Sequence, residues 1–313
     1  MNEIKFTVFS DLHYLPGVFY TDAEKRLDAI YERAVSSGSD FMIHLGDISH
    51  EPDKVPEFIK HYDSFDIPTY HCIGNHECQG NSYEQVLNVF GLDNGYYYFD
   101  RGGFRFIVLD LNYMRIDGEA VHYDMGNYFR RPAGAQLVTF EEKQREWLKE
   151  TVMNSPYLCV LMSHHSINRA NNGMSATERD SIMEMLNELN SDKQRIIMAI
   201  NGHHHMNNLT ILKNIAFFDL NSASYDWIDE GHSGLYPTEM YEKYELLGNT
   251  LVYNDPLSAV ITLRDDGHIK IEGVKSEFIY GINRRKAEVQ ISDTTGCMSS
   301  AEILSAELKL NIV

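Results

Sequence analysis

The sequence predicts a mixed α/β domain, and two observations lead to this prediction. From Ile4 to about residue 200, short apolar runs of strand length alternate with amphipathic segments of helix length. This alternation is typical of βαβ units. Two pairs of apolar runs are also joined by short turns, at Arg101–Gly103 and Asp265–Gly267. Such hairpins add antiparallel strands, so the predicted sheets contain strands of both directions.

Strands are predicted at short apolar runs that are bounded by polar turn residues. In chain order they are Ile4–Ser10, Phe41–Leu45, Pro68–Ile73, Tyr96–Asp100, Phe104–Asp110, Leu158–Met162, Arg195–Ile200, Ser258–Leu263 and His268–Glu272. Helices are predicted at the amphipathic segments between them. These are Thr21–Ser36, Val55–Ser64, Tyr83–Phe90, Glu141–Met153 and Thr177–Leu189. From Leu209 onward the pattern is mostly that of β-structure.

The length of 313 residues allows one elaborated domain or two. No segment has the composition of a convincing linker, so residues 1–280 are expected to form one domain. The tail beyond Tyr280 carries few local signals. Residues 281–313 are therefore expected to be an appendage that packs on the domain.

Charge and composition narrow the class of partner. The 27 Lys and Arg residues and 46 Asp and Glu residues give a net charge of -19, which repels nucleic acid and anionic membranes. Small phosphorylated substrates stay possible, because bound cations can reverse the local charge. No apolar run approaches the roughly 18 residues of a membrane span, and the four cysteines show no metal or disulfide spacing. We expect a cytoplasmic protein without membrane or nucleic-acid partners.

Side chains that can bind metal ions follow five predicted strands directly. The segments are Ser10-Asp11-Leu12-His13, Gly46-Asp47, Gly74-Asn75-His76-Glu77, Ser163-His164-His165 and Gly202-His203-His204-His205. Each has a structural explanation when taken alone; Gly-Asp, for example, is common in turns. Loops at the carboxyl ends of strands meet at one sheet edge, so their recurrence predicts a shared site. The mixture of carboxylate, imidazole and amide groups suits Mn, Fe, Zn, Co or Ni better than Ca²⁺.

These five blocks resemble the pattern of the calcineurin-like metallophosphoesterases, which is D-x-H, G-D, G-N-H-D/E, H and G-H-x-H in this order. The resemblance covers about residues 4 to 220. It implies a four-layer αββα sandwich, in which helices flank two mixed β-sheets. It also implies a pair of divalent metal ions at the strand ends.

The resemblance further implies which residues hold the two ions. The ligands of one ion would be Asp11, His13, Asp47 and His205. The ligands of the other would be Asp47, Asn75, His164 and His203. Asp47 would therefore bridge the pair. His164 is chosen over His165 because the family's ligand is the first histidine after the strand.

His76 matches the family histidine that acts on the leaving group without binding metal. The resemblance thus implies a binuclear hydrolase of phosphoester bonds in small molecules, acting through a hydroxide that bridges the metals. A phosphodiesterase is favoured, and a phosphomonoesterase or nucleotide pyrophosphatase is the alternative. The net charge disfavours a nuclease, and the complete ligand set disfavours a scaffold without activity. His50 stands where some purple acid phosphatases carry a tyrosine ligand, so a purple iron site is not expected.

The segment Asn112–Gln136 is too long for a simple connection, and such loops are often functional. We expect it to form a lid over the substrate, in which aromatic rings stack and arginines pair with phosphate. The alternative is a solvated loop that packs on its own aromatic side chains. The predicted substrate-binding residues are Arg115, His122, Tyr123, Arg130, Arg131 and, outside this segment, His204.

Overall fold

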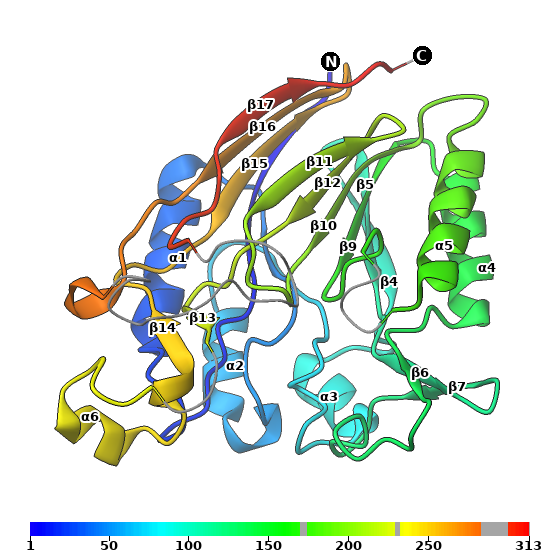
Figure 1. Cartoon of the computed structure of the whole chain (residues 1–313). Coiled ribbons are helices and arrows are strands. Elements are labelled where there is room, and N and C mark those ends of the chain that lie inside the picture. Colours follow the sequence, from blue (N-terminus) through cyan, green and yellow to red (C-terminus); the bar gives the residue numbers. More distant parts are fainter. Residues whose placement is uncertain (170–173, 229–231, 283–299, 313) are drawn as a thin grey trace.

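The computed structural model describes residues 1–169, 174–228, 232–282 and 300–312. Two six-stranded sheets lie face to face, and helices cover the outer face of each (Figure 1). The four-layer αββα sandwich is thus confirmed. In the described part of the chain, no helix combines the length and the apolar content that a membrane crossing requires.

The first sheet has the strand order β17-β16-β15-β1-β2-β3. Its strands are β1 (Glu3–Phe9), β2 (Met42–His44), β3 (Thr69–His71), β15 (Ala259–Arg264), β16 (His268–Gly273) and β17 (Ala306–Lys309). β1, β2 and β3 run parallel, whereas β15, β16 and β17 are joined by antiparallel pairing. The parallel half carries the first three sequence motifs at its carboxyl ends.

The second sheet has the order β11-β12-β10-β9-β5-β4. Its strands are β4 (Tyr97–Arg101), β5 (Phe104–Leu109), β9 (Leu158–Ser163), β10 (Ile196–Asn201), β11 (Asn208–Leu212) and β12 (Ile215–Asp219). The four central strands are parallel, and the edge strands β4 and β11 are antiparallel to their neighbours. The last two motifs follow β9 and β10.

Alternating side chains of each strand face either the partner sheet or the helices. Phe6 of β1 points between the sheets, where its ring stacks on Phe41 at 4.9 Å and meets Phe106 of the other sheet at 5.3 Å. Phe9, three residues along the same strand, packs with the helices instead. Helices α1 (Ala23–Ser37), α2 (Pro56–Asp63) and α3 (Tyr83–Phe90) cover the first sheet; α4 (Glu142–Met153) and α5 (Ala176–Leu189) cover the second.

The elements predicted from sequence lie within two residues of the observed ones, but three regions contain more structure than predicted. Residues 113–137 form a three-stranded antiparallel sheet of β6 (Tyr113–Ile116), β7 (Glu119–His122) and β8 (Gln136–Leu137). Residues 225–252 contain β13 (Tyr225–Trp227), α6 (Thr238–Lys243) and β14 (Thr250–Val252). The tail supplies β17, which pairs with β16. The boundary at residue 280 stays a prediction.

Three short 3₁₀ helices complete the described elements. They are η1 (Pro52–Lys54), η2 (Leu247–Asn249) and η3 (Ile279–Gly281). All three lie in connections, where such single turns are common.

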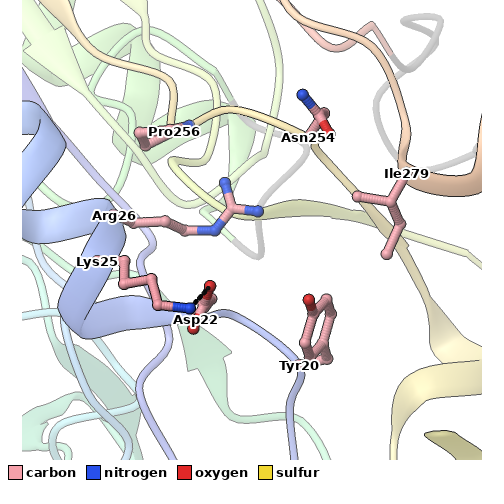
Figure 2. A pocket seen from close by; sticks show the side chains of 7 residues that line it. All are labelled: Tyr20, Asp22, Lys25, Arg26, Asn254, Pro256 and Ile279. Atoms are coloured by element: carbon pink, nitrogen blue, oxygen red, sulfur yellow. Dashed lines mark hydrogen bonds and ion pairs between the residues drawn. The ribbon is translucent and has the colours of Figure 1, made fainter.

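Arg26 of α1 donates hydrogen bonds to the backbone just before its own helix and to two loops that are distant in sequence. Its guanidinium donates from Nε to the carbonyl of Thr21, from Nη1 to Ala223 at 3.3 Å and from Nη2 to Tyr253. The side chain is buried, and Figure 2 shows it projecting into a pocket that Asp22 and neighbouring residues line. Burial lowers the pKa of Arg26 to about 10, so the group stays charged at neutral pH. Arg26 therefore joins α1 to two loops that are distant in sequence.

We expect Arg26→Met to lower the free energy of unfolding by about 2–4 kcal/mol, because three buried carbonyls lose a charged donor. Urea unfolding of the purified protein measures this loss. Arg33→Met is the control on the same helix, since Arg33 donates one bond, from Nη2 to the Glu272 carbonyl at 2.6 Å. Its expected loss is about 1 kcal/mol. Equal losses in the two variants would contradict the role given to Arg26.

Candidate metal centre

The five motifs meet at one edge of the sandwich, where the loops after β1, β2, β3, β9 and β10 converge. The backbone is strained at this edge. Five of the predicted ligands adopt positive φ angles between 47° and 69°, which are uncommon for residues other than glycine. They are Asp11, His13, Asp47, His203 and His205. Such strain costs of order 1–3 kcal/mol per residue and is concentrated at functional sites in proteins.

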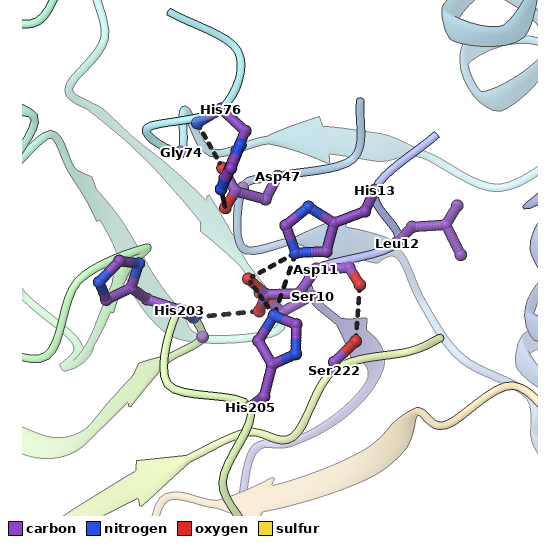
Figure 3. A network of polar contacts seen from close by, with 12 residues as sticks. Ser10, Asp11, Leu12, His13, Asp47, Gly74, His76, His203, His205 and Ser222 are labelled. Carbon is purple, nitrogen blue, oxygen red and sulfur yellow. Dashed lines mark hydrogen bonds and ion pairs between the residues drawn. The ribbon is translucent and has the colours of Figure 1, made fainter. Parts of the chain in front are cut away.

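Asp11, His13 and His205 form the first cluster (Figure 3). The Nε2 atoms of the two histidines are 3.0 Å apart. Asp11 Oδ1 lies 3.5 Å from His205 Nε2 and 3.8 Å from His13 Nε2, yet it is buried without a hydrogen-bond partner among the described residues. An acceptor left alone between two imidazole nitrogens costs stability unless a cation compensates it. This donor set therefore fits a metal ion.

A second cluster adjoins the first through Asp47. Asp47 Oδ2 lies 3.2 Å from His164 Nε2, which is also 3.0 Å from Asn75 Oδ1 and 3.2 Å from His203 Nδ1. The ligand atoms of Asp11, Asp47 and His164 all lie within 4.8 Å of one another. Asp47 is thus placed between the two clusters, and the structure brings all seven predicted ligands together.

Two of the imidazoles are oriented by backbone carbonyls. His205 Nδ1 lies 2.7 Å from the Tyr225 carbonyl oxygen, and His164 Nδ1 lies 2.8 Å from that of Leu45. A carbonyl only accepts, so each Nδ1 carries a proton, and each ring in its neutral form has its Nε2 lone pair directed into the centre. This arrangement is usual for histidines that bind metals.

The carboxylates make the centre favourable for positive charge. Burial lowers the pKa of His164, but the adjacent Asp47 carboxylate outweighs this effect and the pKa is raised to about 9. For His205, burial is likewise outweighed, here by the adjacent Asp11 carboxylate, and its pKa is raised. Burial raises the pKa of Asp47, but attraction to His164 and His76 is stronger and holds it well below its usual value. Metal ions would supply the positive charge that this site favours.

Glu77 joins the loops after β2 and β3 by hydrogen bonds. The sequence analysis did not predict this role. Its carboxylate accepts hydrogen bonds from the backbone N–H groups of Asp47, Ser49 and Gly74 at 2.9, 3.2 and 2.7 Å. Burial, helped by the nearby Asp47 charge, raises the pKa of Glu77 to about 8. Gly74 completes the contact, because a Cβ atom there would lie 2.2 Å from Asp47 Oδ1. The acidic residue at the end of the Gly74–Glu77 motif is the sequence feature that could have indicated this role.

His76 lies beside Asp47 but belongs to neither cluster. Its backbone N–H donates to Asp47 Oδ1 at 2.8 Å, and its Nε2 lies 3.9 Å from Asp47 Oδ2. It groups instead with His13 and His50 (Figure 3 shows the first of these two). The ring is partly exposed, so it can reach a molecule bound at the centre.

Two further histidines border the second cluster. His165 Nε2 lies 3.2 Å from Asn112 Oδ1, and its ring packs 4.2 Å from that of His203. His204 lies near the ion pair of Arg169 and Asp219, and burial lowers its pKa to about 4. Its Nε2 has no hydrogen-bond partner in the described part of the chain. His204 is therefore a neutral ring at the rim of the site.

Most predicted substrate-binding side chains of the 112–136 segment have partners within that segment or beside it. Arg115 donates to the Gly118 carbonyl and Arg131 to that of Tyr128. The other partners are the Met125 carbonyl for Arg130, Asp110 for His122 and the Val138 N–H for Tyr123. None of these hydrogen bonds reaches the metal clusters, so the roles of these five residues in substrate binding stay predictions.

The segment reaches the centre through two other residues, Tyr128 and Phe129. Asn75 Nδ2 donates to the Tyr128 hydroxyl at 3.0 Å, which orients the amide of a predicted ligand. Phe129 stacks on Tyr128 at 4.0 Å and lies 6.4 Å from the His76 ring. Phe129 is 54% exposed, so most of its ring can still contact another molecule.

Comparison with known proteins agrees with this geometry. Residues 4–207 match the model of the calcineurin-like phosphoesterases. The chain belongs to this family. It is a metal-dependent phosphoester hydrolase with a binuclear centre.

Two solved structures illustrate the shared fold. A dimetal phosphatase from Danio rerio is 16% identical, with 88% of this phosphoesterase and 98% of the relative covered at a TM-score of 0.57. GAP50, the anchor in the inner membrane complex of Plasmodium, is 13% identical, with 100% and 90% covered at a TM-score of 0.55. A search of curated proteins finds no match.

Proposed function

We propose that this phosphoesterase hydrolyses phosphodiesters of small molecules at its binuclear centre. One metal ion would be held by Asp11, His13, Asp47 and His205, and the other by Asp47, Asn75, His164 and His203. The mixed oxygen and nitrogen donors favour Mn, Fe, Zn, Co or Ni. When bound, two such ions neutralise phosphoryl oxygens and activate water for attack on phosphorus.

The chain's own residues would supply orientation and a proton. The carbonyls of Leu45 and Tyr225 keep His164 and His205 directed into the centre. His76 would donate a proton from Nε2 to the departing oxygen, as a general acid within reach of the centre. Its partial exposure leaves room for the leaving group.

One observation favours a diester over a monoester: two aromatic side chains lie beside different histidines of the centre. Phe129 stands beside His76, whereas the half-buried Trp227 lies 5.9 Å from the ring of His13 and 6.0 Å from that of His205. A monoester carries one organic substituent, and a diester carries two. Each of these two aromatic side chains can therefore contact one substituent of a small diester, including a nucleobase or another flat ring.

The test compares an aryl phosphodiester with the matching aryl monoester, after chelation and reconstitution with Mn²⁺. We expect a higher kcat/KM for the diester and a raised KM for it in Phe129→Ala. Tyr98→Ala is the control, since Tyr98 is also an exposed aromatic residue but lies on β4. Preference for the monoester, or an unchanged KM in Phe129→Ala, would overturn the diester assignment.

We also propose a reducing compartment, the cytoplasm, as the location. Cys72, Cys78 and Cys159 are buried free thiols, and structural disulfides are typical of oxidising compartments instead. Blocking accessible thiols before and after denaturation, followed by mass spectrometry of protein from the native cell, checks this proposal. A disulfide at any of these residues would contradict it.

A further inference from the structure

We propose that Gln79 and His50 are positioning residues, which set the ring tautomers of His13 and His76 through a shared set of hydrogen bonds. The roles of His13 as a ligand and His76 as an acid rest on the proposed function. The hydrogen bonds themselves do not depend on it. Gln79 lies outside the five sequence motifs, and His50 lies three residues after Asp47, at the position where some relatives carry a tyrosine ligand.

The contacts form a continuous chain. His13 Nδ1 lies 2.9 Å from His50 Nε2, and His50 Nδ1 lies 3.1 Å from Gln79 Oε1. The same oxygen lies 2.8 Å from His76 Nδ1. His50 is buried, and its ring packs 4.7 Å from that of Phe19. A single amide oxygen thus connects the predicted acid with a predicted metal ligand.

The direction of each bond follows from the metal site. His13 Nε2 faces Asp11 and His205, so a lone pair on Nε2 requires the proton of His13 to be on Nδ1. His50 Nε2 must then accept that proton's hydrogen bond. A neutral imidazole that accepts at Nε2 carries its own proton on Nδ1. That N–H needs an acceptor, and Gln79 Oε1 lies at the right distance.

His76 obeys the same rule. Its Nδ1–H donates to Gln79 Oε1, so in the protonated imidazolium the second proton is on Nε2, which faces Asp47 and the leaving group, and transfer of that proton leaves the Nδ1–H tautomer. An amide oxygen has two lone pairs, so it can accept from His50 and His76 together. The two Nδ1 atoms are also 3.0 Å apart, so the two rings and the Gln79 amide form one compact polar cluster.

The opposite amide orientation is incompatible with metal binding by His13. A donating Gln79 N–H would require a lone pair on His50 Nδ1 and therefore a proton on His50 Nε2. His13 Nδ1 would then have to accept, and His13 Nε2 would carry the proton that excludes a metal. Only an acceptor at position 79 keeps both histidines in the productive form.

Gln79 allows a clean test because it is exposed, so its substitution does not disturb the core. Gln79→Met keeps the length of the side chain and removes the acceptor. Gln79→Glu keeps an acceptor and cannot donate from its carboxylate. His50→Phe keeps a ring against Phe19 but cuts only the branch that leads to His13.

The first readout is ¹⁵N NMR of the histidine rings in the metal-free protein, which reports tautomers without any activity. We expect His13 and His76 to be Nδ1-protonated in the parent and in Gln79→Glu, and to populate both tautomers in Gln79→Met. In His50→Phe only His13 should change. Unchanged tautomers in Gln79→Met, or identical spectra of Gln79→Glu and Gln79→Met, would overturn the proposal even if the enzyme hydrolyses another phosphoester.

The second readout is Mn²⁺ affinity together with turnover. We expect Gln79→Met to lose about 10–100-fold in Mn²⁺ affinity, as is typical for residues that orient metal ligands, and to lose kcat most for poor leaving groups. Gln79→Glu should stay close to the parent in both. His50→Phe should lose Mn²⁺ affinity while its dependence on the leaving group matches the parent. Parental Mn²⁺ affinity in both Gln79→Met and His50→Phe would overturn the proposal.

Discussion

Asp47→Asn is expected to empty both metal positions and to lower kcat/KM by at least about 10²–10³-fold, the loss typical for one preorganised electrostatic partner. Asp47 is the carboxylate between the two clusters, 3.2 Å from His164 Nε2. Asparagine retains the shape and one acceptor for the His76 N–H, but it brings no charge to offset two divalent ions. The loss should therefore affect both positions rather than one.

Metal content per chain, measured after dialysis against limiting Mn²⁺, checks this expectation. Asp110→Asn is a matched control, because Asp110 is also a buried carboxylate bonded to a histidine, His122, at 2.8 Å. That variant should lose stability but keep two metals per chain. If Asp47→Asn bound two metals with parental affinity, Asp47 would not be the bridging ligand.

The fold and the metal motifs could be predicted because their signals are local. A buried strand followed at once by a polar residue, as in Phe9-Ser10-Asp11, is visible in a few consecutive letters. The parallel strands then bring these loops to one edge by topology alone. The ligand set follows from five such segments, each of which is short and contains chemically specific residue types.

The supporting contacts could not be predicted, because they join ordinary residues across the chain. His50 and Gln79 are 29 residues apart, and neither has a pattern that suggests the other. Arg26 bonds to carbonyls of Ala223 and Tyr253, 197 and 227 residues away. Any backbone carbonyl can accept such a bond, so the sequence does not indicate which carbonyls Arg26 will contact.

The 112–136 segment shows a different cause of incomplete prediction. Its arginines are predicted to pair with phosphate because of their charge, but charge does not reveal which partner a side chain takes. Arg115 donates a hydrogen bond to the nearby Gly118 carbonyl, and His122 is hydrogen-bonded to the Asp110 carboxylate. The strands β6 and β7 are four residues each, too short for alternation to be distinguished from chance. The contact of Phe129 with His76 depends on how these short strands and local bonds fold the segment, which the sequence pattern does not reveal.

His76→Ala is expected to lower kcat by about 10²–10⁴-fold, the range for a general acid, while both metals stay bound. The variant keeps the backbone N–H that donates to Asp47 Oδ1 at 2.8 Å, so the bridging carboxylate keeps its orientation. Because only the imidazole is lost, the chemistry should suffer where the leaving group needs a proton. An alkoxide needs one, whereas a nitrophenolate leaves without it.

The decisive comparison is thus kcat for a nitrophenyl ester against kcat for an alkyl ester of the same phosphate, with metal content measured in parallel. The alkyl ester should show the larger loss in His76→Ala, and Gln79→Met should show a smaller loss with the same bias. His61→Ala, which removes an exposed histidine paired with Asp28, should match the parent for both esters. Equal losses for the two esters in His76→Ala would move the imidazole from proton donation to phosphate binding, and the bond to Gln79 would then orient a ring that binds phosphate instead of an acid.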